Sequence, residues 1–166
     1  MEKLFVPLKK EKHSLTLKPA PPVQDVLWGV LTPEERAFFH ERNRQSIGRW
    51  AEEKTQAFLK AQGLKIVARN VRDRFSELDI VCRDGGELVI AEVRCRREGA
   101  VMSAFDSMGI QKWRKLTRGA ELFVVKSGWE GGWRIDLVTV DVSDGQWRLS
   151  WLKYLEMDGG GRDDGC

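Results

Sequence analysis

The fold is decided between residues 77 and 94, where the sequence reads ELDIVCRDGGELVIAEVR. Two runs rich in Leu, Ile and Val flank the turn residues Asp84-Gly85-Gly86-Glu87, and this pattern is typical of a β-hairpin. The length of the turn sets the register of the strands. With Gly85 and Gly86 at its centre, the hairpin places Asp79 opposite Glu92 and Glu77 opposite Arg94.

The acidic residues of this hairpin predict a neighbouring cation, because like charges that face each other on adjacent strands repel. Glu77 shares a strand face with Asp79, and Arg94 shares one with Glu92. Carboxylates among Leu, Ile and Val suit a hard divalent ion such as Mg²⁺ or Mn²⁺, which can activate water for phosphodiester cleavage. The alternative is that Asp79 and Glu92 lie at a solvated sheet edge, or that they are neutralised by an arginine: Arg72, Arg74 or Arg94.

Helical signals precede the hairpin. Thr32-Pro33-Glu34-Glu35 combines an N-cap, a proline at the first helical position and a capping-box glutamate. We expect a helix from there, a break near residues 43–48, and a second helical segment over 48–62 that ends at Gly63. A short strand is expected over 65–69. Residues 1–30, with their proline-rich run 19–22, are expected to form a flexible N-terminal arm.

Beyond the hairpin, the spacing of apolar residues predicts a helix over 104–125. A Gly- and Trp-rich loop then leads to a strand over 134–140, a turn at Asp144-Gly145 and a strand over 147–152. The Gly- and Asp-rich residues 158–166 are expected to be disordered. This order predicts one α/β domain over 31–157, with a mixed central sheet flanked by helices.

Composition fits a single globular domain: 166 residues, with 28 Lys plus Arg against 25 Asp plus Glu and a net charge of +3. Three cysteines without CxxC spacing argue against a disulfide framework and a cysteine zinc site, and favour a reducing, cytoplasmic setting. The N-terminus lacks the apolar run of a signal peptide, and no stretch is apolar enough to span a membrane. We therefore expect a cytoplasmic protein without a membrane partner.

Several short motifs lie in order along the chain. They are Gly48-Arg49-Trp50-Ala51-Glu52, Ala68-Arg69-Asn70, Ser76-Glu77-Leu78-Asp79-Ile80-Val81, Ala91-Glu92-Val93-Arg94-Cys95-Arg96, Lys112 to Leu116 and Arg134-Ile135-Asp136-Leu137-Val138. Through these motifs the chain resembles the YraN-like family of bacterial proteins, which have an endonuclease-like fold of the PD-(D/E)XK nuclease superfamily. The resemblance implies a restriction-endonuclease-like core over about 46–142, preceded by an extra N-terminal arm and helix.

The resemblance also implies roles for single residues. Asp79 and Glu92 match the superfamily's metal-binding acids, and Glu52 is a further acidic candidate on the helix, with Glu77 beside them. The superfamily usually has a catalytic lysine at the position of Arg94. Arginine keeps the charge but cannot give up its proton. Lys112, on the helix that follows, could approach the site instead.

Basic residues near this site are candidates for binding nucleic acid: Arg96, Arg97, Lys112 and Lys115. The alternative is a merely solvated helix face. The leading hypothesis is a nuclease-like protein that binds DNA or another nucleic acid and uses Mg²⁺ (or Mn²⁺). The second hypothesis is a binding module that lost catalysis with Arg94, and the third is a protein-interaction domain that uses the arm and the Trp-rich loop.

Overall fold

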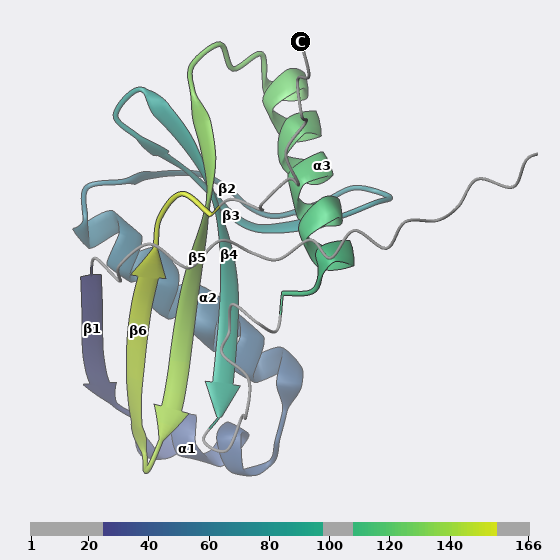
Figure 1. Ribbon diagram of the computed structural model, residues 1–166. Coiled ribbons are helices and arrows are strands. Elements are labelled where there is room, and N and C mark those ends of the chain that lie inside the picture. Colours follow the sequence, from purple (N-terminus) through teal and green to yellow (C-terminus); the bar gives the residue numbers. More distant parts are fainter. Residues whose placement is uncertain (1–24, 98–107, 156–166) are drawn as a thin grey trace, which may run out of the picture.

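The computed structural model describes residues 25–97 and 108–155. Its helices and strands follow one another as β1 (Asp25–Val30), α1 (Pro33–His40), α2 (Arg44–Ala61), β2 (Lys65–Arg72), β3 (Glu77–Asp84), β4 (Glu87–Arg97), α3 (Ile110–Ser127), β5 (Trp133–Ser143) and β6 (Gln146–Leu152). The strands form a single sheet in the order β1-β6-β5-β4-β3-β2 (Figure 1). Only β4 and β5 are parallel neighbours, joined through α3, and the other neighbouring strands are antiparallel.

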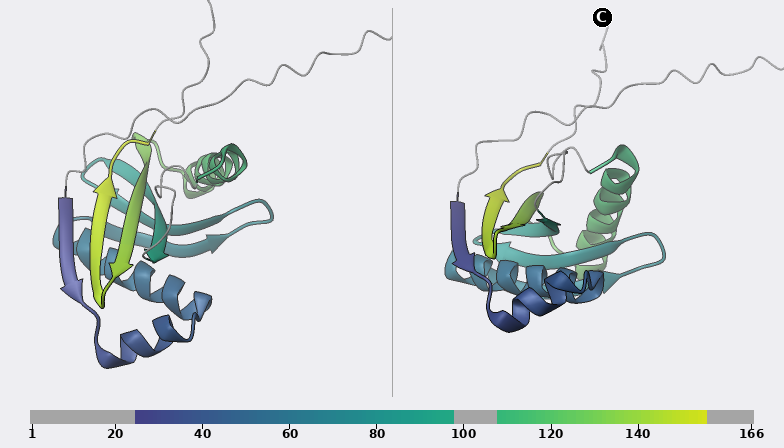
Figure 2. Two further views of the ribbon diagram at one scale, coloured as in Figure 1. Left: turned by 60° about the horizontal axis from the view of Figure 1, so that its bottom comes forward. Right: turned by 90° about the horizontal axis from the view of Figure 1, so that it is seen from below.

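Helices cover both faces of the sheet (Figure 2). On one face, α1 and α2 bury Phe39, Trp50 and Leu59 against strand residues such as Ile80 and Val89. On the other face, α3 packs through Leu116 and Ala120. Each apolar face of the sheet is therefore removed from water by a helical layer, which is the arrangement expected of a three-layer α/β domain.

The helix boundaries follow from their caps. Thr32 and Glu35 form the capping box that the sequence predicts, with hydrogen bonds of 2.9 Å and 3.2 Å. The predicted break between the first two helices is confirmed, but α2 begins at Arg44 rather than at Gly48. The reason is Asn43, whose side chain caps the helix by accepting a hydrogen bond from the Ser46 backbone N–H at 3.0 Å.

The hairpin register is confirmed near the turn, where Asp84 pairs with Glu87 and Ile80 with Ala91. Gly85 has a φ of 58°, a conformation that glycine adopts without strain. The second predicted turn, Asp144-Gly145, has φ angles of 49° and 73° and joins β5 to β6. Both turns have the positive φ values that favour two-residue hairpins.

Two predicted boundaries differ from the structure. Residues 25–30, which we assigned to the N-terminal arm, form β1 and pair with β6 at the edge of the sheet. The helix predicted from residue 104 begins at Ile110, after Met108 and Gly109. The rest of the predicted arm and the predicted disordered tail, 158–166, lie outside the described residues, as do residues 104–107. Within the described ranges, no helix is both long and apolar enough to cross a membrane.

Candidate active site

The candidate site lies where β3 and β4 separate. Their ladder of paired residues ends at Ile80 and Ala91, so the predicted pairs Asp79–Glu92 and Glu77–Arg94 fall just beyond it. Beyond this point, the carboxylate of Asp79 replaces a backbone carbonyl as the hydrogen-bond partner of β4: it accepts a hydrogen bond from the Val93 backbone N–H at 2.8 Å. The Asp79 side chain is thereby held between two diverging strands.

Strand alternation is also broken at Asp79. Ile80 packs on the α1 and α2 side of the sheet, whereas Leu78, two residues earlier, packs on the α3 side. On β2, the pairing places Asn70 opposite Asp79, between the pairs Arg69–Ile80 and Val71–Leu78. Asn70 has a left-handed φ of 49°, which asparagine tolerates better than most residues. The irregularity therefore spans both strands at this point.

Asn70 connects this irregularity to α2. Its side chain lies near the carboxylate of Glu52, a half-buried residue of that helix. Burial raises the pKa of Glu52, and the nearby charge of Asp79 raises it further, while the polar side chain of Asn70 opposes both. Glu52 thus lies close enough to Asp79 for the two carboxyl groups to repel each other.

Glu92 is the most buried acid of the site, with 2% of its surface exposed. Two cations approach its Oε1 atom: Lys112 Nζ at 3.2 Å and Arg94 Nε at 3.3 Å. Burial raises the pKa of Glu92 to about 7, and the charge of Asp79 adds to this rise, although Lys112 and Arg94 lower it. The pKa of Asp79 is raised in the same way by burial, against the Val93 hydrogen bond and the charge of Lys112.

Two buried polar atoms of the site have no hydrogen-bond partner among residues 25–97 and 108–155. The Oε2 atom of Glu92 is unpaired, and the Nε of Arg94 is near Oε1 without the geometry of a hydrogen bond. Buried polar atoms in native proteins are nearly always paired with protein, water or a ligand. An unpaired carboxylate oxygen beside a second buried carboxyl group, Asp79, is therefore suited to a bound cation.

A cation here would be held by two carboxylates. Among residues 25–97 and 108–155, no three His, Cys, Asp or Glu side chains are grouped so that they could hold a metal ion together. Glu52, the predicted third ligand, is therefore not grouped in this way with Asp79 and Glu92. A two-carboxylate site still fits Mg²⁺, which commonly keeps several waters and binds through one or two carboxylates together with substrate phosphates.

The other predicted site residues lie around this centre rather than in it. Glu77 forms an ion pair with Arg72 at 2.8 Å. Arg96 pairs with Asp141 of β5 at 2.7 Å, and the guanidinium of Arg97 lies 5.5 Å from the ring centre of Phe39 in α1. Lys115 is exposed and, like Lys112, borders a hollow beside the β2–β3 loop.

This β2–β3 loop, residues 73–76, is a feature that we did not predict. Asp73 closes the loop by accepting hydrogen bonds from the backbone N–H groups of Phe75 and Ser76 at 2.6 Å and 2.9 Å. The sequence signal was an aspartate followed three residues later by serine between two strands, a common turn composition. The loop packs on α3 at Gly119, where an added Cβ would lie 2.0 Å from the Ser76 hydroxyl.

A second buried charged cluster has a structural explanation. Arg134, 6% exposed, forms ion pairs with Asp136, Asp84 and Glu87. Asp136 also accepts hydrogen bonds from the Trp151 indole and the Tyr154 backbone, each at 3.0 Å. Both Asp136 oxygens are therefore paired, in contrast to those of Glu92, and the cluster joins β3, β4 and β5 to the end of β6.

The Trp-rich loop is likewise part of the packing. The Trp129 side chain packs against the α3-side core, and its indole N–H donates to the Gly132 carbonyl at 2.9 Å. Trp133 is the first residue of β5 and packs against the same core. The aromatic rings of this loop therefore stabilise the entry into β5.

A mixed sheet between helical layers, with an acidic pair where two strands separate, defines a protein with a restriction-endonuclease-like fold. A model of the uncharacterised protein family UPF0102 matches residues 51–140, which include Glu52, Asp79, Glu92 and Lys112. The chain belongs to this family, the YraN-like proteins.

Individual relatives support the same assignment. The chain is 42% identical over 118 residues to a UPF0102 protein of Pseudomonas paraeruginosa, which covers 67% of this chain and 92% of the relative. It is 38% identical over 120 residues to a UPF0102 protein of Anaeromyxobacter dehalogenans, and the match covers 72% of this chain and 89% of that relative. A third, from Herpetosiphon aurantiacus, is 30% identical over 121 residues, covering 70% and 98%.

Proposed function

We propose that the chain is a metal-dependent nuclease that cleaves phosphodiester bonds in DNA. The observation that carries the proposal is the unpaired, buried Oε2 atom of Glu92, which lies beside Asp79 and has two cations on the other oxygen of the same carboxylate. Burying the carboxyl group of Glu92 beside that of Asp79 costs solvation free energy, and the ion pairs with Arg94 and Lys112 leave Oε2 unpaired among the described residues. Perturbed, buried acids of this kind are common at catalytic sites.

Each residue of the site has a chemical role in this proposal. Asp79 and Glu92 would hold Mg²⁺ or Mn²⁺, and such an ion lowers the pKa of bound water and stabilises charge on a phosphate. Arg94 neutralises the scissile phosphate as a fixed cation. Lys112 has an ammonium group that can exchange a proton, so it can orient the attacking water or assist the leaving oxygen, which Arg94 cannot do.

The test is cleavage of labelled single-stranded, nicked and branched DNA by the purified chain with Mg²⁺ or Mn²⁺. We expect Asp79→Asn and Glu92→Gln to abolish cleavage, and Lys112→Ala to reduce it by about 10²- to 10⁴-fold, the usual contribution of a proton-transferring side chain. Lys60→Ala is the control, because Lys60 is an exposed lysine in the last turn of α2 that, among the described residues, contacts neither Glu92 nor the hollow beside the β2–β3 loop. Cleavage that survives both carboxylate substitutions refutes the mechanism.

A second candidate function is a DNA-binding module without catalysis. It is favoured by one specific observation: an arginine, Arg94, occupies the strand position next to Glu92 where a lysine would be suited to proton transfer. This candidate predicts metal-independent binding, no cleavage by the natural chain, and no cleavage by Arg94→Lys. Cleavage by Arg94→Lys alone would mean that the site is one substitution away from activity and that Lys112 does not replace the missing lysine.

A further inference from the structure

We propose that the groove between the β2–β3 loop and α3 binds an unpaired stretch of DNA strand and that Phe75 stacks on one of its bases. This inference rests on the proposed function and names the kind of DNA that reaches the acidic site. The groove is formed by two adjoining hollows of about 800 Å³ and 430 Å³, which share the residues from Arg72 to Phe75.

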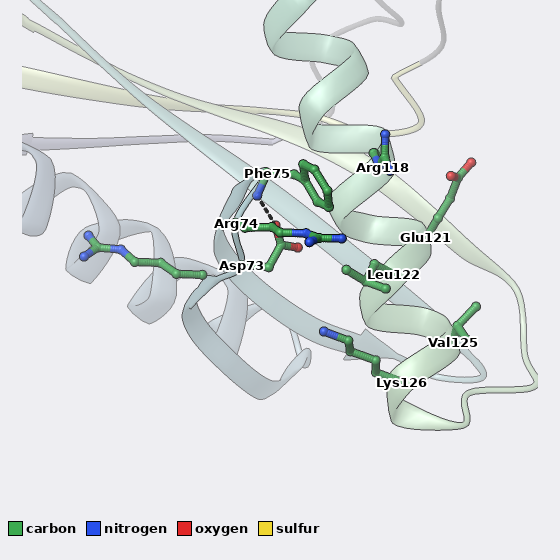
Figure 3. Close-up of a pocket in the computed structure, with 9 residues that line it drawn as sticks. Asp73, Arg74, Phe75, Arg118, Glu121, Leu122, Val125 and Lys126 are labelled. Atoms are coloured by element: carbon green, nitrogen blue, oxygen red, sulfur yellow. Dashed lines mark hydrogen bonds between the residues drawn. The ribbon is translucent and has the colours of Figure 1, made fainter.

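The groove and the candidate active site share Lys112. Lys112 borders the smaller hollow, and its ammonium group is the one that lies 3.2 Å from Glu92. The larger hollow continues along α3 past Arg118 to Lys126 (Figure 3). A strand that follows the groove would therefore bring a phosphodiester bond to Lys112 and the acidic pair.

The charge of the groove suits a phosphate backbone. Six basic side chains border the two hollows, against three acidic ones, Asp73, Glu77 and Glu121. The basic residues are Arg72, Arg74, Lys112, Lys115, Arg118 and Lys126. Glu77 is paired with Arg72, and Lys112 with Glu92, so two of the basic residues are already engaged. Four basic residues are left against Asp73 and Glu121: Arg74, Lys115, Arg118 and Lys126. This excess positive charge is available to phosphates, whose counterions are released on binding.

The aromatic ring of Phe75 distinguishes unpaired from paired DNA. Phe75 is 37% exposed and belongs to neither apolar core. Its ring lies 4.3 Å from the guanidinium carbon of Arg118 and 4.5 Å from that of Arg74, both of which are exposed (Figure 3). Base faces are accessible in single strands and covered in a duplex, and they stack on aromatic rings and on guanidinium planes alike. A base on Phe75 would displace one guanidinium, which then lies beside a phosphate.

The loop is held so that the ring stays in the groove. Asp73 holds the Phe75 backbone through the 2.6 Å hydrogen bond drawn in Figure 3. On the opposite side, the loop touches α3 at Gly119, where no side chain separates them. Phe75 is thus presented by a closed turn against a helix, so little conformational entropy has to be lost when a base stacks on it.

The experiment measures binding without cleavage. Fluorescence anisotropy of a labelled oligodeoxythymidylate of about 12 nucleotides, within the usual site size of single-strand binders, is recorded in EDTA at low salt, with a duplex of equal length in parallel. We expect tighter binding of the single strand, an affinity about tenfold lower in Phe75→Leu, and natural affinity in Phe75→Trp. Arg118→Gln should lower the slope of log affinity against log salt by about 0.7.

Matched controls lie on the opposite edge of the sheet. Trp28 is an exposed aromatic residue of β1 with the guanidinium of Arg148 5.6 Å from its ring centre, so Trp28→Leu and Arg148→Gln remove the same chemistry elsewhere. Equal affinity for duplex and single strand, or equal losses in Phe75→Leu and Trp28→Leu, overturns the inference. Because the binding assay in EDTA contains no free metal ion, it tests binding separately from cleavage. Phe75-dependent binding without any later cleavage in Mg²⁺ would contradict only the proposed function. Cleavage without Phe75-dependent binding would overturn only the proposal that the groove binds an unpaired strand.

Discussion

Replacing Glu92 by glutamine should make the protein more stable at neutral and alkaline pH. The reason is the burial of Glu92, which raises the pKa of its carboxyl group from an ordinary 4.5 to about 7. Because the folded state binds this proton more tightly than the unfolded state, the natural chain loses stability as the pH rises from about 4.5 to about 7. Glutamine has nearly the same shape as glutamate and cannot ionise, so the free energy of unfolding of the variant does not fall over this pH range for this reason.

The size of the effect follows from the shift. A rise from 4.5 to about 7 corresponds to about 3 kcal/mol, at about 1.4 kcal/mol for each pH unit. The attraction of Arg94 and Lys112 for the carboxylate is already contained in this net shift. We therefore expect Glu92→Gln and the natural chain to have similar free energies of unfolding near pH 4.5, and the variant to be more stable by up to about 3 kcal/mol at pH 8.

Urea unfolding followed by tryptophan fluorescence from pH 4.5 to pH 8 measures this difference. The comparison between the two chains cancels the titration of the groups that both contain and that do not interact with Glu92. A difference that does not change with pH, or a natural chain that is the more stable one at pH 8, would refute the reasoning. Adding Mg²⁺ at pH 8 should raise the stability of the natural chain and leave that of Glu92→Gln unchanged, since ligands stabilise only the state that binds them.

Further predictions concern the parts of the fold that surround the site. Gly119→Ala should destabilise the protein by about 1–3 kcal/mol, as overpacking usually does, because the new Cβ meets the Ser76 hydroxyl. Adding Ser76→Gly should restore most of the melting temperature. A double variant as unstable as the single one would contradict this. Arg134→Met should cost about 3–5 kcal/mol in urea unfolding, because Asp136 stays buried without its cation; a loss below about 1 kcal/mol would show that the cluster is not needed. Thr32→Ala should cost about 1 kcal/mol by removing half of the capping box, and an unchanged unfolding midpoint would mean that the first helix adds nothing to stability.

The hairpin could be predicted from the sequence because its information is local. Two glycines at the turn and the apolar runs beside them set the register, and the structure pairs Asp84 with Glu87 as expected. The ladder of pairs ends before Asp79, and Asp79 lies opposite the left-handed Asn70 of β2. No pattern within the hairpin gives information about a neighbouring strand.

The edge strand β1 could not be predicted for a related reason. Its sequence, DVLWGV, follows a proline-rich run and has no clear alternation, so it was assigned to the arm. It becomes a strand by pairing with β6, more than a hundred residues away, as in the pair Leu27–Leu149. Strand formation at a sheet edge is decided by the partner strand rather than by local propensity.

The two cations at Glu92 were only partly predictable. Arg94 lies two residues from Glu92 on the same strand, so alternation alone places both on one face. Lys112 reaches the same oxygen from α3, and this contact depends on where the helix crosses the sheet. From the sequence, Lys112 was a residue that could approach the site from the following helix. The position of its ammonium group could not be predicted.

This convergence changes what the arginine at position 94 implies. If Arg94 were the only cation beside Glu92, its permanently charged guanidinium would leave the site without a group that can exchange a proton. The ammonium of Lys112 lies as close to the same oxygen, 3.2 Å against 3.3 Å, and it comes from a helix that also borders the basic groove. Charge neutralisation and proton exchange can therefore be divided between a strand residue and a helix residue. For this reason, if the natural chain cleaves DNA, Lys112→Ala rather than Arg94→Lys is the substitution that tests which residue exchanges the proton.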